Sequence, residues 1–238
     1  MTGADGQAAW LEEKGHALLS TLHPALLPPD LLDETSQSLD RWLGQSAGSR
    51  NLLAHPQCLA MAAWLNTRLT ALGLLDTASV AVQCTLFDKT ADKNWLVALH
   101  QDTSIPASAN GMASVLKEGE PYVQPPVDVL QSLLAVRVHL DDCGADAGPL
   151  RVVPGSHRAG RLDADAAQAL RSAHGETICT AARGDALLMR PLLLHASSRA
   201  RSPARRRVLH FLFGPERLPH GLVWNRTVAG SPPPHQEN

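Results

Sequence analysis

The chain has 238 residues and a formal net charge of −2, with 44% hydrophobic and 18% charged residues. This length can bury a substantial core in one large domain, and the composition is typical of a globular protein. The weak net charge argues against an electrostatic nucleic-acid-binding surface. No apolar run reaches the roughly 18 residues that a membrane helix needs, so we expect neither nucleic acid nor membrane as a partner.

The four cysteines are dispersed along the chain, and none forms a C-x-x-C pair. This distribution fits reduced thiols better than a disulfide framework. The N-terminal residues are acidic and only mildly apolar, so no signal peptide is expected. Together these features predict a cytoplasmic protein, and they leave its oligomeric state open.

The first third of the chain has helical patterns. Residues 8–22 carry apolar side chains at mixed three- and four-residue spacing, and Pro24 ends the pattern. Asp30 can cap a second helix that runs to about residue 45. A third helix is predicted over residues 56–74, where Gly73 ends it. These helices form a predicted N-terminal flank over residues 1–76.

From residue 79 onward the pattern changes to short strands. Strands are predicted over residues 79–87, 95–100, 133–140, 148–155, 177–181, 186–190, 192–196 and 207–213, with a helical insert at 163–174. Helices followed by such a series predict a mainly β fold with flanking helices, a sandwich or barrel. We expect one domain over residues 1–229 with its β core at 77–215, and a disordered tail at 230–238.

A candidate metal motif follows the run at residues 95–100. In His100-Gln101-Asp102 the first and third side chains point the same way if the strand continues. Two imidazoles and one carboxylate on one face of Fe(II) leave the opposite positions open, which is the arrangement of oxygen-activating iron sites. The second histidine must then come from a distant strand that packs opposite.

The same spacing occurs at His139-Leu140-Asp141 and, with glutamate, at His174-Gly175-Glu176. A chain with 11 histidines contains such a pair by chance, so the motif only opens a hypothesis. His100 leads into a long polar segment at residues 103–127, as a ligand at a barrel mouth does. His139 lies late in a strand, where a supporting role is equally natural. The pattern favours His100 without deciding between them.

The distant histidine is predicted to be His195, which ends an apolar run and is followed two residues later by Ser197. An Arg- and Ser-rich turn and a returning strand come next, which predicts a hairpin with His195 on one arm and arginines on the other. If 2-oxoglutarate chelates the iron, its carboxylate far from the metal needs a charged partner. A guanidinium can bind that carboxylate through two parallel hydrogen bonds. The alternatives are that most of these arginines lie in a solvated turn and that His195 is a core histidine.

Several blocks in a fixed order carry a family resemblance over about residues 80–213. They read CTLFDKTADKNWLVALHQD, VRVHLDDCGADAGPLRVVPGSHRAGRL, GDALLMRPLLLHASS and RRRVLHFLF. In this order they resemble the phytanoyl-CoA dioxygenase family of Fe(II)/2-oxoglutarate oxygenases. The resemblance implies a double-stranded β-helix, the jelly-roll fold of cupins.

The resemblance also assigns roles by position. It implies three iron ligands: His100, Asp102 and His195. It implies that Arg206 binds 2-oxoglutarate, with Arg207 as the alternative, and that His139 does not bind the iron. It implies that Gln101 and Ser197 contact the cosubstrate. The related halogenases lack the carboxylate ligand, so Asp102 favours hydroxylation.

The implied reaction uses Fe(II), 2-oxoglutarate and molecular oxygen to hydroxylate a small organic metabolite, releasing succinate and carbon dioxide. Residues 103–127 are the candidate lid, and Lys117 and Arg137 are the candidate substrate-facing residues. This segment lacks the tryptophan that many relatives carry near its middle.

Two alternatives stay open. A cupin-like metalloenzyme that does not use 2-oxoglutarate predicts Arg206 directed to solvent. A non-catalytic binding protein predicts separated His100, Asp102 and His195.

Overall fold

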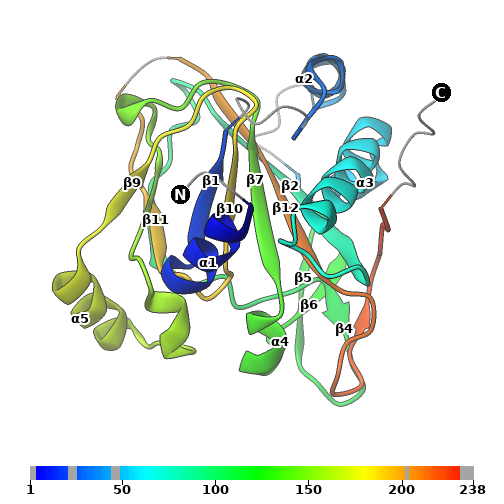
Figure 1. The fold of residues 1–238 in the computed structure, drawn as a ribbon, viewed down its shortest axis with the longest axis vertical. Helices are drawn as coiled ribbons and strands as arrows, with labels where there is room; N and C mark the ends of the chain where they lie inside the picture. Colours follow the sequence, from blue (N-terminus) through cyan, green and yellow to red (C-terminus); the bar gives the residue numbers. More distant parts are fainter. Residues whose placement is uncertain (1–3, 21–25, 44–48, 202–203, 231–238) are drawn as a thin grey trace.

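The computed structural model describes residues 4–20, 26–43, 49–201 and 204–230. Two antiparallel sheets form successive layers, and helices cover the far side of the larger sheet (Figure 1). From β7 to β12 the chain passes from the larger sheet to the smaller one and back twice, so the described part forms a cupin-like double-stranded β-helix. The expected fold class is confirmed.

The larger sheet has the order β1 (His16–Leu19), β10 (Ala186–Met189), β7 (Leu134–His139), β12 (Arg206–Pro215), β2 (Ser79–Lys89). The smaller sheet has the order β3 (Val97–His100), β11 (His195–Ser197), β8 (Leu150–Val152), β9 (Thr177–Cys179). Two short ribbons pair β13 (Val223–Trp224) with β4 (Ala107–Ser108) and β5 (Ser114–Lys117) with β6 (Glu120–Val123).

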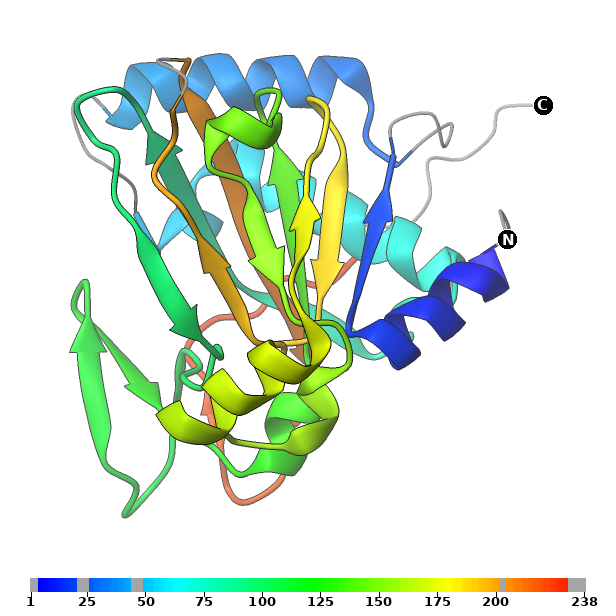
Figure 2. The same ribbon diagram turned by 90° about the vertical axis from the view of Figure 1, so that its left-hand side faces the viewer.

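The helices are α1 (Ala4–Lys14), α2 (Pro29–Leu43), α3 (Pro56–Ala71), α4 (Val127–Gln131) and α5 (Ala164–His174), with short 3₁₀ turns at Leu52–Ala54, Ala145–Ala147 and Ser156–Ala159. Figure 2 shows α2 lying across the upper edge of the sheets and the β5–β6 ribbon projecting at the lower left. No helix of the described residues is both long and apolar enough to cross a membrane.

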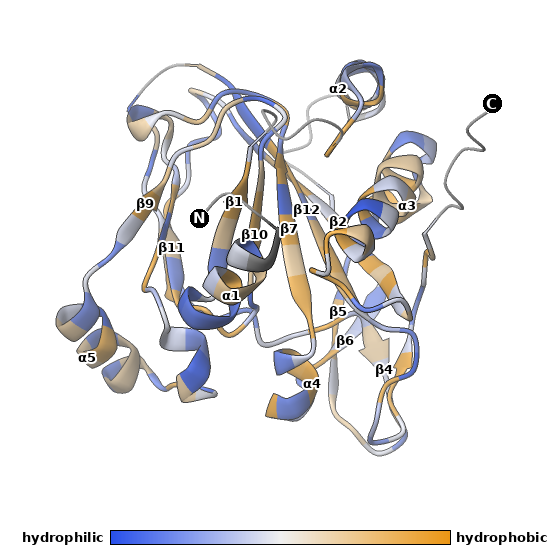
Figure 3. Cartoon of the chain, in the orientation of Figure 1, coloured by the Kyte–Doolittle hydropathy of each residue, from blue (hydrophilic) through white to orange (hydrophobic). Residues whose placement is uncertain are grey.

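The period-two alternation of β12 explains how the larger sheet serves two cores. Leu209, Phe211 and Phe213 are buried in the cluster that contains helical residues such as Leu39 and Leu65. The intervening residues point into the space between the sheets. Apolar residues accordingly concentrate on the central strands (Figure 3). The helical layer therefore fixes the sheet from outside and leaves its inner face for other groups.

The predicted helix over residues 8–22 is wrong in its second half. Helix α1 ends at Lys14, where Gly15 takes φ +78° and donates its N–H to the carbonyl of Leu11 at 2.8 Å. A Cβ on Gly15 would lie 2.4 Å from Nδ1 of His157, so only glycine fits. Strand β1 follows because it pairs with β10, a partner far along the chain that local periodicity does not reveal.

The predicted hairpin between His195 and the arginines is also wrong. Strand β11 lies between β3 and β8 in the smaller sheet, whereas β12 lies between β7 and β2 in the larger one. Both edges of each strand are occupied, so β11 and β12 cannot pair with each other. The connection instead crosses from one sheet to the other, and it carries His195 and Arg206 on opposite walls.

The long segment at residues 103–127 contains strands rather than open loop. Its hairpin β5–β6 turns at Glu118 (φ +52°) and Gly119 (φ +83°), and positive φ at both central residues marks a two-residue turn of type I′. The other predicted helices and strands form within a few residues of their expected ends. The domain bounds 1–229 remain a prediction, and residues 231–238 of the expected tail, like Pro24, lie outside the described residues.

Candidate metal and cosubstrate site

The side chains of His100, Asp102 and His195 converge at the end of strand β3 in the smaller sheet. His195 on β11 lies opposite His100 on β3 in the antiparallel register, so both imidazoles stand on one face, with ring centroids 4.1 Å apart. Asp102 follows β3 and is anchored by its N–H, which donates to the Pro191 carbonyl at 2.9 Å. Its carboxylate oxygens lie 3.7 Å from Nε2 of each histidine. The ligand atoms all lie within 4.8 Å of one another, a spacing that one metal ion can bridge.

The hydrogen bonds of the two imidazoles fit them for metal binding. Nδ1 of His100 lies 2.8 Å from the Ala98 carbonyl, and Nδ1 of His195 lies 2.9 Å from the Leu193 carbonyl. A carbonyl only accepts, so each Nδ1 carries the proton and each Nε2 presents a lone pair. Backbone bonds of this kind fix the ring orientation of metal-binding histidines. The donor set therefore fits Fe(II).

The protonation states of His195 and Asp102 also suit metal binding. Burial lowers the pKa of His195 to about 4, although Asp102 opposes the shift, so the ring is neutral at pH 7. Burial alone would raise the pKa of Asp102, but His195 and His100 lower it well below its usual range. The site thus offers one carboxylate and, at His195, a neutral imidazole, the protonation states in which these groups bind metal.

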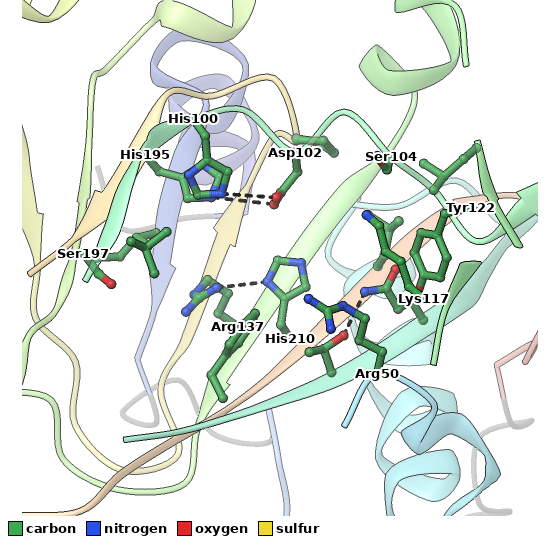
Figure 4. Close-up of a pocket in the computed structure, with 18 of the residues that line it drawn as sticks. Arg50, His100, Asp102, Ser104, Lys117, Tyr122, Arg137, His195, Ser197 and His210 are labelled. Carbon is green, nitrogen blue, oxygen red and sulfur yellow. Dashed lines mark hydrogen bonds and ion pairs between the residues drawn. The ribbon is translucent and has the colours of Figure 1, made fainter. Parts of the chain in front are cut away.

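A cavity of about 180 Å³ lies between the triad and the inner face of the larger sheet. Figure 4 shows the triad on one side and Arg137 and His210 on the other. The lining includes the metal triad together with Ser197, Arg206, Arg137 and Lys117. These are seven of the eight residues singled out from the sequence.

Arg206 is the most unusual group in this cavity. It is 3% exposed, yet no hydrogen bond or ion pair joins its guanidinium to any residue that the structure describes, and its Nε is buried without a partner. Its neighbour Arg207 points to the other side of β12, where it donates to Asp141 at 2.7 and 2.9 Å and to Asp40 at 3.0 Å. The side chain of Arg206, not that of Arg207, faces the cavity.

Lys89 lies beside Arg206, since the two are register partners on β2 and β12. It is 1% exposed, and its Nζ donates to Ser197 Oγ at 3.2 Å and to the Ser198 carbonyl at 2.8 Å. Burial, and then the charge of Arg206, lower its pKa to about 8. Within the described residues neither cation forms an ion pair with a carboxylate, so this end of the cavity attracts an anion.

Arg137 and His210 form a second fixed pair on β7 and β12. Arg137 donates from Nη1 to Nδ1 of His210 at 3.0 Å, and its guanidinium lies 5.2 Å from the Phe87 ring. Because arginine only donates, the neutral His210 ring carries its proton on Nε2. Burial, and then Arg137, lower the pKa of His210 to about 3, so the ring stays a neutral donor in the cavity.

The family assignment rests on a match along most of the chain. The family model described as "Phytanoyl-CoA dioxygenase (PhyH)" matches residues 11–208. The chain belongs to the phytanoyl-CoA dioxygenase family. It is therefore an Fe(II)- and 2-oxoglutarate-dependent dioxygenase, whose reaction class also requires molecular oxygen. Among the curated proteins, none matches this sequence.

Solved structures share the fold of this family member at low identity. EctD from S. alaskensis with bound Fe is 20% identical with a TM-score of 0.68, over 90% of this chain and 78% of EctD. HygX from Streptomyces hygroscopicus with nickel and 2-oxoglutarate is 18% identical with a TM-score of 0.61, over 88% of this chain and 86% of HygX. The epimerase SnoN is 16% identical with a TM-score of 0.57, over 96% and 95% of the two chains.

Gln101, which was predicted to contact the cosubstrate, makes three hydrogen bonds to the protein backbone. Its Nε2 donates to the carbonyls of Gly160 at 2.8 Å and Leu192 at 2.7 Å, and its Oε1 accepts from the N–H of Leu162 at 2.9 Å. Gln101 follows the last residue of β3, and these bonds direct its side chain away from the cavity that His100 and Asp102 line. Gln101 links the segment that follows β3 to the backbone of residues 160, 162 and 192, and its side chain does not line the cavity.

The cavity residues that were not predicted include four with charged or hydrogen-bonding side chains: Lys89, His210, Arg50 and Tyr122. Two of them carried a usable signal. Lys89 continues the alternation of Thr85 and Phe87, and His210 lies four residues after Arg206 on the same face. Arg50 and Tyr122 reach the cavity only through tertiary contacts, which no local pattern encodes.

Proposed function

We propose that this dioxygenase hydroxylates a C–H bond of a small organic metabolite. In this proposal His100, Asp102 and His195 hold Fe(II), and Arg206 binds the far carboxylate of 2-oxoglutarate. The observation that carries the proposal is the buried guanidinium of Arg206, which has no partner among the described residues and lines the same cavity as the triad.

The energetic reason is the cost of an unpaired buried charge. Such a charge costs several kcal/mol unless a partner neutralises it. A guanidinium is matched by a carboxylate, which accepts two parallel hydrogen bonds from it. Lys89 and Ser197 lie next to Arg206 and can add a charge and a hydroxyl to the same carboxylate. The folded chain thus holds a preformed anion site that its own residues leave unfilled.

The division of labour follows from these positions. When bound, Fe(II) and 2-oxoglutarate supply the oxygen chemistry: substrate, oxygen and 2-oxoglutarate give hydroxylated substrate, succinate and carbon dioxide. The protein holds the imidazoles through the Ala98 and Leu193 carbonyls and orients the cosubstrate through Arg206. It also surrounds the reacting groups with sheet walls that limit water.

Asp102 supports hydroxylation as the outcome, because a carboxylate in the triad leaves no ligand position for halide. The small-molecule assignment draws support from two structures with the same fold. EctD was crystallised with 2-oxoglutarate and 5-hydroxyectoine, and HygX with 2-oxoglutarate and hygromycin B. The four cysteines are free and buried, which supports the expected cytoplasmic location.

The test is an anaerobic titration of the protein with Fe(II) and 2-oxoglutarate, followed through the visible metal-to-ligand charge-transfer band. We expect the band in wild type, and we expect Arg206→Ala to weaken 2-oxoglutarate binding by about tenfold to a hundredfold, the effect of losing a charge-assisted bidentate pair. Arg217→Ala removes the same charge from an exposed position and serves as the matched control. Absence of the band in wild type would refute the proposal.

A further inference from the structure

The cavity has a second cationic end, away from Arg206. On the inner row of β12, Arg206 and Leu212 are six residues apart, which is about 20 Å at 3.3 Å per residue. Lys89 pairs with Arg206 at one end and Gln83 with Leu212 at the other. Gln83, Arg50 and Tyr122 also line a common hollow, so these residues gather at the Gln83 end. Figure 4 shows Arg50, Lys117 and Tyr122 together on one side of the triad, opposite Ser197.

Lys117 provides an unneutralised charge at this end. It lines the cavity, and its ammonium lies 4.7 Å from the centre of the Tyr122 ring. No ion pair joins it to a carboxylate in the part of the chain that the structure describes. Burial, and then the nearby charge of Arg50, lower the pKa of Lys117, whereas Asp102 opposes the shift. Asp102 is committed to the metal in the proposed function, so it does not neutralise this lysine.

Arg50 is neutralised, and its partner fixes the ribbon that carries Lys117. Oε2 of Glu118 accepts from the Arg50 N–H at 2.7 Å and from Ser49 Oγ at 3.1 Å, and Oε1 lies 3.4 Å from Arg50 Nη1. The side chain of Asn51 donates to the Glu118 carbonyl at 3.2 Å. These contacts hold Glu118 at φ +52°, a conformation that non-glycine residues rarely adopt. Hydrogen bonds therefore hold the β5–β6 turn against residues 49–51, and this contact keeps Lys117 at the cavity.

The cations at this end are Lys117, Arg50 and Arg226. The carboxylates are Glu118, paired with Arg50, and Glu120, the register partner of Lys117, so the formal charge is +1. The groups around it are polar: Tyr122 is 4% exposed and lines the cavity, as do Gln83 and Ser104. A single positive charge among hydrogen-bonding groups matches a singly charged acid rather than a phosphate ester or a long acyl chain. The cavity volume of about 180 Å³ also limits the entering group to a compact one.

We propose that the substrate of this dioxygenase is a small carboxylic acid, whose carboxylate is bound by Lys117, with Arg50 and Tyr122 beside it, while 2-oxoglutarate occupies the Arg206 end. This inference rests on the proposed function. It places the two anions at opposite ends of the cavity with the metal triad between them, so the carbon skeleton of the acid lies against the metal.

The test uses the anaerobic Fe(II)–2-oxoglutarate complex and a panel of small carboxylic acids, each paired with its neutral carboxamide. Binding is measured through the change that each compound causes in the charge-transfer band, and turnover through succinate release in air. We expect acids to perturb the band and their carboxamides to bind about tenfold to a hundredfold more weakly, the loss of one charge-assisted contact. Lys117→Ala should abolish this preference and leave 2-oxoglutarate binding unchanged.

Two control variants make the outcome specific. Lys117→Arg keeps the charge and should retain the preference for acids. Lys14→Ala removes a lysine charge from the distant helix α1 and should change nothing. The inference is overturned if no acid perturbs the wild-type band, if carboxamides bind as well as acids, or if Lys117→Ala weakens 2-oxoglutarate instead. A missing band in wild type before any acid is added would instead refute the proposed function.

Discussion

Two regions of this chain carry the same His-x-Asp motif and differ in what surrounds it. His100 and Asp102 end a short strand of the smaller sheet, where β11 brings His195 alongside. His139 and Asp141 end the central strand β7, where β12 brings Arg206 and Arg207. Asp141 forms an ion pair with Arg207, and both ring nitrogens of His139 are buried with no hydrogen-bond partner among the described residues. The neighbouring strand, not the motif, decides which histidine–aspartate pair is free to bind metal.

The largest expected effect separates the two aspartates by metal affinity. Asp102→Ala removes a proposed ligand, and we expect Fe(II) affinity to fall by more than the roughly 10- to 100-fold typical of changes behind the ligands. Asp141→Ala should keep Fe(II) affinity within about threefold, because its carboxylate faces Arg207. Anaerobic Fe(II) titration of both variants checks this. Equal losses in the two variants would show that the motifs are not distinct.

For the free energy of unfolding we expect the opposite order, with a larger loss in Asp141→Ala than in Asp102→Ala. Asp141→Ala leaves Arg207, which is 8% exposed, with Asp40 as its remaining ion-pair partner among the described residues, and we expect a loss of about 2–4 kcal/mol in the free energy of unfolding. Asp102→Ala, measured without metal, should cost less than about 1 kcal/mol, since its side chain is 37% exposed and its carboxylate lies 3.7 Å from each imidazole. Urea unfolding of the metal-free proteins measures both. A stable Asp141→Ala would contradict the structural role.

A smaller effect concerns the cations that face inward from β2 and β12. The pKa of Lys89 lies near 8, lowered by burial and then by Arg206, whereas Cys143 raises it and Arg137 lowers it further. Lys89 is therefore charged below pH 8 and loses its charge as the pH rises above it. We expect 2-oxoglutarate affinity to fall above pH 8, by at most about tenfold per pH unit for one linked proton. Binding measured from pH 6.5 to 9.5 (about three units) should show this fall, and Lys89→Met should lack it.

The smallest expected effect tests the role that the structure gives Gln101. Gln101→Ala removes three hydrogen bonds to Gly160, Leu192 and Leu162, and we expect a stability loss of about 1–3 kcal/mol. Because its side chain does not line the cavity, 2-oxoglutarate affinity should change less than about twofold. Thermal unfolding and the charge-transfer titration measure the two quantities. A selective loss of 2-oxoglutarate binding would restore the role expected from the sequence.

The sequence predicted the parts of the fold that local patterns encode. The alternation of β7 and β12 and the helices α2, α3 and α5 follow from spacing and end signals within each segment. Strand β1 could not be predicted, because HALL alternates too briefly to differ from a helical turn and pairs with β10 far along the chain. The hairpin failed for the same reason: β11 and β12 are neighbours in sequence, but their partners lie elsewhere.

The candidate site shows the same division. The triad and Arg206 could be selected because the ordered sequence blocks that contain them resemble the phytanoyl-CoA dioxygenase family. Arg50 and Tyr122 could not be selected from the sequence. Arg50 reaches the cavity through its contacts with Glu118, and Tyr122 through the β5–β6 ribbon that carries it. Residues that approach a site through tertiary contacts carry no local signature. Apart from Lys117, the polar residues at the proposed substrate end of the cavity were therefore found only in the structure.

The most direct test is a crystal structure of the anaerobic Fe(II)–2-oxoglutarate complex with iron located by anomalous diffraction. We predict one iron at about 2.0–2.3 Å from Nε2 of His100, Nε2 of His195 and a carboxylate oxygen of Asp102. The far carboxylate of 2-oxoglutarate should lie on Arg206, with Lys89 and Ser197 beside it. Iron bound elsewhere, or that carboxylate on Lys117 with Arg206 left unpaired, would contradict the proposed arrangement.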